Sequence, residues 1–228
     1  MTASALAGDH LSLLETAQPL CLRHALALAG PDALAAHGLR ATRSTGLVLV
    51  TAENPPLADI ATGLVEHLRA AGHRAGIATG TPRQIQLTGT PCPVELRKEP
   101  LRHPVLLLPG VPVPVVALPD AAALTVLRLC DRALPEDLAA LHVLAGRFPE
   151  GELVALARAF DEDFQPGALA DRLEAAAELV HPDAAARSAW AHAWAQDLRL
   201  DLLETQEAAD GLHDPYLEAV EAEQSDDL

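Results

Sequence analysis

The spacing of apolar residues changes along the chain, and this change predicts an α/β part followed by a helical part. Residues 11–29 are rich in Leu and Ala and predict helix, which Pro19 either bends or divides in two. The unbroken apolar run at 47–51 predicts a strand buried on both faces, and a capped helix is expected from Asn54 to Gly72.

Short strands and then helices are predicted in the rest of the chain. Gly30 and Pro31 open a short helix that Gly38 ends. Apolar and polar residues alternate in short segments, and turns containing Gly and Pro separate these segments. This pattern predicts strands at 75–78, 83–87, 94–98, 105–108 and 111–116. Helical spacing then predicts helices at 119–131, 135–145, 149–160, 166–180 and 182–205.

The expected fold class is therefore α/β, a mixed sheet with flanking helices followed by a helical C-terminal half. We expect an α/β domain at 1–118, a helical domain at 119–206 and an acidic tail at 207–228.

Composition and charge limit the kinds of partner that this protein is expected to bind. Half of the 228 residues are apolar, but only three Phe, two Trp and one Tyr are present, which leaves few aromatic rings on which bases could stack. Of the net charge of −16, residues 200–228 carry −10, with ten acids and no Lys or Arg. We therefore expect no nucleic-acid partner, and the tail is suited to a basic protein partner.

Targeting signals and metal-binding spacings are not evident. Cys21, Cys92 and Cys130 are far apart and indicate buried thiols in a reducing compartment. The N-terminus has no basic region, and prolines interrupt the longest apolar run, 104–119, so neither a signal peptide nor a membrane helix is expected. We expect a cytoplasmic protein without a cofactor.

The segment 27–51 carries a more specific pattern. It reads ALAGPDALAAHGLRATRSTGLVLVT and resembles the start of the AbiEii/AbiGii-type nucleotidyltransferase family, as found in actinobacterial members. In that family a Gly-Gly pair opens a short helix, and a His-Gly, an Arg-x-Ser/Thr and an Asp-x-Asp on a buried strand follow. The likeness extends over about 20–205 and includes Val94-Glu95-Leu96 and a Leu-Pro-Asp helix start at 118.

The resemblance implies nucleotidyl transfer, in which carboxylates hold two Mg²⁺ ions at the triphosphate and a glycine turn admits the phosphates. This chain departs from the pattern at several of those positions. Pro31 replaces the second glycine, Gly46 and Val48 stand where the family has the two aspartates, and Thr125 stands where it has a lysine. Because a single remaining carboxylate cannot organise two magnesium ions, we expect degenerate metal and phosphate motifs.

The function expected is thus a nucleotidyltransferase-fold protein that does not transfer nucleotides and binds a small-molecule ligand, or runs another reaction, in the cleft between its domains. The alternatives are an enzyme of specialised metabolism that reuses this cleft and an active toxin-type nucleotidyltransferase. His37 is either an acid/base group or a histidine with a backbone partner. The candidate catalytic residues are Glu95, Glu99 and His37, and the candidate ligand-binding residues are Gly30, Arg43, Ser44, Arg97, Arg132 and Asp137.

Overall fold

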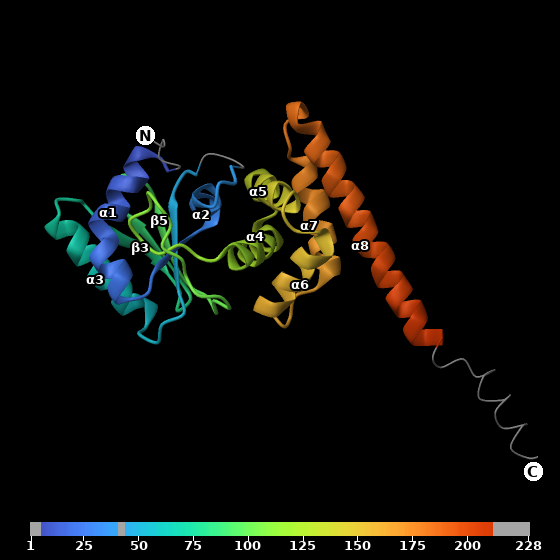
Figure 1. Cartoon of the computed structure of the whole chain (residues 1–228), viewed down its shortest axis with the longest axis horizontal. Coiled ribbons are helices and arrows are strands. Elements are labelled where there is room, and N and C mark those ends of the chain that lie inside the picture. The colour runs from blue at the N-terminus through green and yellow to red at the C-terminus, as the bar shows by residue number, and fades with distance from the viewer. Residues whose placement is uncertain (1–5, 41–43, 212–228) are drawn as a thin grey trace, which may run out of the picture. The chain divides into compact units, whose positions relative to one another are not determined.

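A mixed five-stranded sheet lies at the centre of the first part of the chain (Figure 1). The computed structural model describes residues 6–40 and 44–211. The strands are β1 (Ala27–Ala29), β2 (Leu47–Thr51), β3 (Gly76–Gly80), β4 (Gln84–Thr88) and β5 (Val94–Lys98), in the order β1-β2-β5-β4-β3. Only the β2–β5 pair is parallel, and its register sets Val48 beside Glu95 and Val50 beside Arg97.

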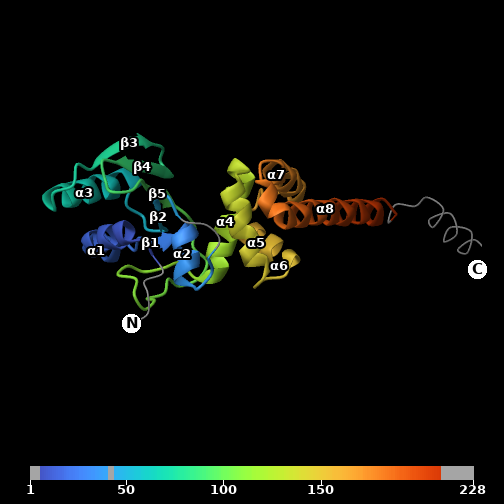
Figure 2. The same ribbon diagram turned by 90° about the horizontal axis from the view of Figure 1, so that it is seen from above.

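Helices cover both faces of this sheet (Figures 1 and 2). The helices of this part are α1 (Gly8–Arg23), α2 (Gly30–Ala36), α3 (Leu57–Ala70), α4 (Leu118–Arg132), α5 (Pro135–Ala145) and α6 (Glu150–Phe160). Because side chains alternate along a strand, Leu47 and Leu49 face away from Val48 and Val50. All five residues of β2 are buried, as expected for a strand covered on both sides.

The predicted α/β class with a helical C-terminal half is confirmed, and two local predictions are wrong. Residues 27–29 form β1, antiparallel to β2, and do not continue the first helix. Residues 105–108 and 111–116 form no strands, and only isolated bridges join Val115 to Leu28 and to Leu106. The prolines in this segment lack the N–H groups that a continuous ladder needs.

A buried carboxylate fixes the segment that follows β5. The side chain of Asp120, in the first turn of α4, is fully buried and accepts hydrogen bonds from the backbone N–H groups of Arg102 and His103 at 3.0 and 3.1 Å. It also contacts the ring Nδ1 of His103. Asp120 therefore ties the chain after the sheet to the start of the helix.

The chain divides into two compact units, Met1–Phe164 and Gln165–Leu228. In the second, α7 (Pro166–Glu178) packs on α8 (Ala185–Gly211), after a short 3-10 helix at Pro182–Ala184. Arg199 of α8 bridges Glu174 and Asp171 of α7.

The boundary expected at residue 118 coincides with the change from strands to helices. As a division between functional domains it stays a prediction.

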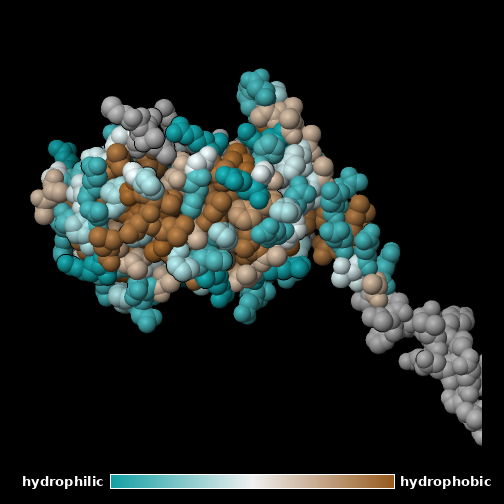
Figure 3. Space-filling model, in the orientation of Figure 1, coloured by the Kyte–Doolittle hydropathy of each residue, from teal (hydrophilic) through white to brown (hydrophobic). Residues whose placement is uncertain are grey.

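The surface carries a few exposed apolar side chains. Apolar residues gather in patches on the face drawn in Figure 3, and Leu107 and Leu203 are among the large apolar residues that are exposed. None of the helices in the described part of the chain is long and apolar enough to cross a membrane. Most of the predicted acidic tail, 212–228, lies outside the described residues, so its binding to a basic partner stays a prediction.

Candidate functional site

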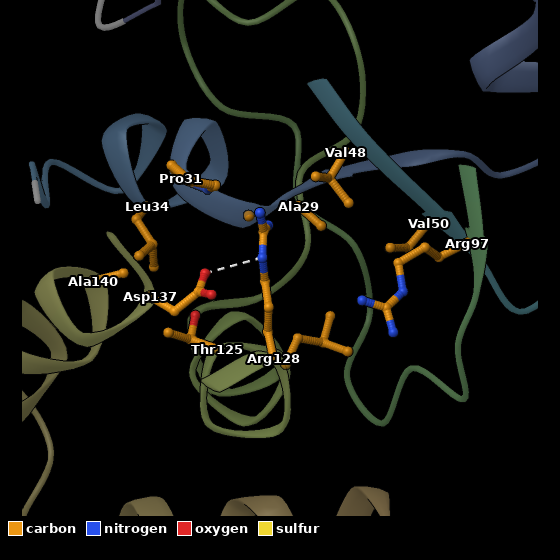
Figure 4. A pocket seen from close by; sticks show the side chains of 12 residues that line it. Ala29, Pro31, Leu34, Val48, Val50, Arg97, Thr125, Arg128, Asp137 and Ala140 are labelled. Carbon is orange, nitrogen blue, oxygen red and sulfur yellow. Dashed lines mark ion pairs between the residues drawn. The ribbon is translucent and has the colours of Figure 1, made fainter. Parts of the chain in front are cut away.

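A cleft lies inside the first unit, where β2 and β5 face α4 and the start of α2. It consists of two adjoining cavities that share Pro31, Val48 and Arg128. The larger has a volume of about 440 Å³ and is also lined by Ser44, Thr45, Gly46, Leu47, Gln86, Leu87, Pro93, Val94, Glu95, Arg132 and Glu136. The smaller, about 30 Å³, is shown in Figure 4 and is lined mainly by apolar side chains, with Arg97 and Asp137 among the exceptions.

The start of α2 forms one wall, and its backbone requires glycine. Gly30 has φ +66°, a conformation that side chains disfavour. A Cβ at this position would lie 3.2 Å from Val48 Cγ2 and 3.3 Å from Arg128 Nη1. Pro31 occupies the first turn, where its fixed φ suits the helix and its missing N–H removes one donor from the cleft.

Two arginines of α4 share one buried carboxylate of α5. Arg132 donates from Nε and Nη2 to both oxygens of Asp137 at 2.7–3.0 Å. Arg128 Nε lies 3.0 Å from Asp137 Oδ1, the ion pair drawn in Figure 4. Burial raises the pKa of Asp137, and hydrogen bonds from Arg132 oppose that rise. Burial likewise lowers the pKa of Arg128, opposed by the charge of Asp137.

The opposite wall is the polar part of the sheet face. Glu95 of β5 accepts a hydrogen bond from Gln84 Nε2 at 3.0 Å and lies 3.8 Å from Arg97 Nε. Arg97 Nε lies closer, at 2.8 Å, to Glu99. Burial raises the pKa of Glu99, and the charge of Arg97 offsets only part of that rise. Glu99 lines a different cavity, near Arg83 and Arg102. The structure therefore brings Glu95 and Arg97 to the cleft, whereas Glu99 lines a separate cavity to which Arg97 also contributes.

The donor set does not fit the two-magnesium arrangement that the family resemblance implies. Val48 and Val50 of β2 point into the cleft. Of Gly46, which directly precedes β2, Val48 and Glu95, only the last is an acid. A Cβ at Gly46 would lie 2.7 Å from the carbonyl oxygen of Pro93, so the backbone leaves no room for an aspartate there. No group of three His, Cys, Asp or Glu residues in the described part of the chain could hold a metal ion.

The remaining predicted site residues fall in different places. Ser44 lines the larger cavity, and its hydroxyl donates to the Gly46 carbonyl at 2.6 Å. His37 Nε2 lies 2.8 Å from the Val116 carbonyl oxygen, and His37 lines neither cavity. Arg43 lies outside the described residues.

Arg128 lines both cavities and is absent from the sequence-derived candidates. Its spacing was the available signal. Arg128 and Arg132 are four residues apart in a predicted helix, which places them on one face, and Asp137 follows at the start of the next helix.

Comparison with known proteins supports the fold. No protein-family model matches the chain, and none of the curated proteins matches it significantly. Among solved structures, it is similar to the nucleotidyltransferase toxin MenT4 of Mycobacterium tuberculosis, with a TM-score of 0.52 and 22% identity over 85% of this chain and 86% of that one.

A second solved structure is ANT(2")-Ia in complex with adenylyl-2"-tobramycin. The TM-score is 0.51 with 11% identity, over 68% of this chain and 98% of that one. The chain thus has a nucleotidyltransferase-like fold.

Proposed function

We propose that this protein uses a nucleotidyltransferase-like fold to bind a small molecule and does not transfer nucleotides. The observation that carries the proposal is a pair of cleft positions, Gly46 directly before β2 and Val48 within it, neither of which supplies a carboxylate. Without a second acid beside Glu95, the two metal ions of nucleotidyl transfer lack ligands. The order of motifs in 27–51 supports a further proposal, that the chain is a degenerate relative of the AbiEii/AbiGii-type family.

The charge of the cleft also disfavours a triphosphate. The positive charges of Arg128 and Arg132 are matched by Asp137, which both contact, and by Glu136 and Glu95 on the larger cavity. A triphosphate without its magnesium ions would bring several negative charges to a site with no positive surplus, and desolvating them would be costly. A ligand of zero net charge faces no such penalty.

The two structural neighbours carry different descriptions. One is described as a nucleotidyltransferase toxin, and the other holds an adenylylated small molecule. Since one fold hosts many reactions, these likenesses support the architecture, and the function depends on the residues of the site.

A reaction in the cleft is a second candidate, and the position of Glu95 favours it. This carboxylate is partly buried on the wall of the larger cavity, where it reaches a bound molecule without a metal. Glu95→Gln would then abolish turnover while leaving binding of an uncharged substrate in place.

Calorimetric titration with nucleotides tests the main proposal. We expect ATP and GTP with Mg²⁺ to show no binding tighter than ~1 mM, which corresponds to ~4 kcal/mol. The same titration with excess EDTA is the control for metal-independent binding. Micromolar affinity that requires magnesium would overturn the proposal.

A further inference from the structure

The guanidinium of Arg128 has one edge engaged and one edge open. Its Nε forms an ion pair with Asp137, whereas within the described residues its two terminal nitrogens make no hydrogen bond. The side chain is largely buried, with 19% of its surface exposed, and lines both cavities. A guanidinium fixed through Nε presents its terminal nitrogens as a fork that matches the two oxygens of a carboxylate.

Gly30 keeps this fork accessible. Any side chain at that position would begin 3.3 Å from Nη1 of Arg128 and would cover it. Figure 4 shows the guanidinium directed from α4 toward the start of α2, with Val48 close by.

A carboxylate lies across Val48 from this fork. Val48 Cγ2 and Arg128 Nη1 both lie within 3.4 Å of the point where a Gly30 Cβ would stand. Val48 and Glu95 are register partners on neighbouring strands, which places their Cα atoms about 5 Å apart. The larger cavity therefore offers a cationic fork and a carboxylate on either side of one apolar side chain.

The rest of that cavity is suited to an apolar group. Among its lining residues, the side chains of Pro31, Val48 and Pro93 are apolar. Its volume of about 440 Å³ exceeds that of a single amino acid. A ligand with both charges would satisfy Arg128 and Glu95 and leave the charge of the cleft unchanged.

We propose that the cleft binds a zwitterionic amino acid with an apolar side chain, its carboxylate on the terminal nitrogens of Arg128 and its ammonium toward Glu95. This inference rests on the proposed small-molecule function and specifies the ligand class. It does not require the protein to be an enzyme.

Three matched probes test the assignment. They are L-phenylalanine, 3-phenylpropionate, which lacks the ammonium, and phenethylamine, which lacks the carboxylate. Measured by saturation-transfer NMR and calorimetry, L-phenylalanine should bind at least about tenfold more tightly than either analogue, because each analogue makes only one of the two charged contacts.

Variants separate the two contacts. Arg128→Gln should weaken L-phenylalanine and 3-phenylpropionate about tenfold and leave phenethylamine unchanged, whereas Glu95→Gln should weaken L-phenylalanine and phenethylamine only. Arg128→Lys keeps the positive charge beside Asp137 and should retain the fold. It lacks the two terminal nitrogens and should therefore still weaken the probes that carry a carboxylate. Arg83→Gln, at a residue that lines neither cavity, is the control.

Equal weakening of all three probes by Arg128→Gln would indicate structural damage and overturn the assignment, as would an absence of L-phenylalanine binding at about 10 mM. The nucleotide titration on the same samples distinguishes the two failures. If neither magnesium nucleotides nor L-phenylalanine bind, the amino-acid assignment fails and the absence of nucleotide chemistry still holds.

Discussion

Asp137 is the residue on which the arrangement of the cleft depends most. It is buried and holds two guanidinium groups that come from successive turns of α4. Replacing Asp137 by Ala leaves the partly buried Arg128 without a counter-charge, and we expect the free energy of unfolding to fall by about 3–5 kcal/mol.

Chemical denaturation measures this loss, and Glu136→Ala is the matched control. Glu136 is half-exposed and lies 3.7 Å from Arg132, so its removal should cost at most about 1 kcal/mol. Similar losses in the two variants would contradict the role given to Asp137.

Gly46 is required by its contact with a neighbouring backbone. A Cβ at this position would lie 2.7 Å from the carbonyl oxygen of Pro93. Gly46→Ala should therefore destabilise the protein by about 1–3 kcal/mol through overpacking, as measured by urea denaturation. Gly151→Ala in α6, where nothing lies within 4 Å of the added carbon, should not lower stability, because Ala is favoured over Gly in a helix.

Two buried thiols make the stability of the folded protein depend on pH above about 9. Burial raises the pKa of Cys21 to about 12 and that of Cys92 to about 11, from an ordinary value of 9.0. Because the folded state holds these protons more firmly, their contribution to stability is complete below pH 9 and is lost as the pH rises toward 11 and 12.

At pH 8.5 a thiol reagent should modify no more than one cysteine of the folded protein, Cys130, and all three in denaturant. Rapid modification of Cys21 in the folded state would show that α1 opens locally.

The residue types of the site could be predicted in part from sequence. Glu95, Arg132 and Asp137 were identified, and the structure places them at the cleft. Glu99 and His37 were grouped with them, but one lines another cavity and the other bonds a backbone carbonyl. Arg128 was missed although it lies four residues before the predicted Arg132 on α4, because the spacing that puts both on one helix face was not used.

At the scale of elements, the link from β5 to α4 depends on Asp120. Its carboxylate accepts two backbone N–H groups of a segment that has no strand partner of its own. Asp120→Ala should lower the free energy of unfolding by about 2–4 kcal/mol and speed amide exchange at Arg102 and His103. The exposed Asp131, changed to Ala, should have little effect on either measurement.

Elements with strong periodic patterns were predicted well. The strands at 47–51 and 94–98 agree with the structure residue by residue, since apolar runs and alternation fix them locally. The three-residue β1 was missed because its sequence, Ala-Leu-Ala, favours helix and only pairing with β2 makes it a strand.

At the scale of the whole molecule, the end of α8 contributes little to the folded core. All described side chains from 201 to 208 are exposed, although three of them are leucine or alanine. A chain truncated after Glu207 should therefore keep its melting temperature within about 2 °C. A decrease of several degrees in calorimetry would show that residues beyond this point pack on the body.

The contact between Gly46 and Pro93 also has a consequence for how this protein can change over generations. At position 48 an acid would need only a new side chain, whereas at position 46 it would first need β2 and the turn before β5 to separate. The two substitutions that the metal-binding pattern lacks are thus unequal, and mutation of one residue at a time meets a barrier in the main chain. Under the function proposed above, closing this contact removes the short route back to metal-dependent catalysis, and selection would then act on whatever other ligand the cleft can hold.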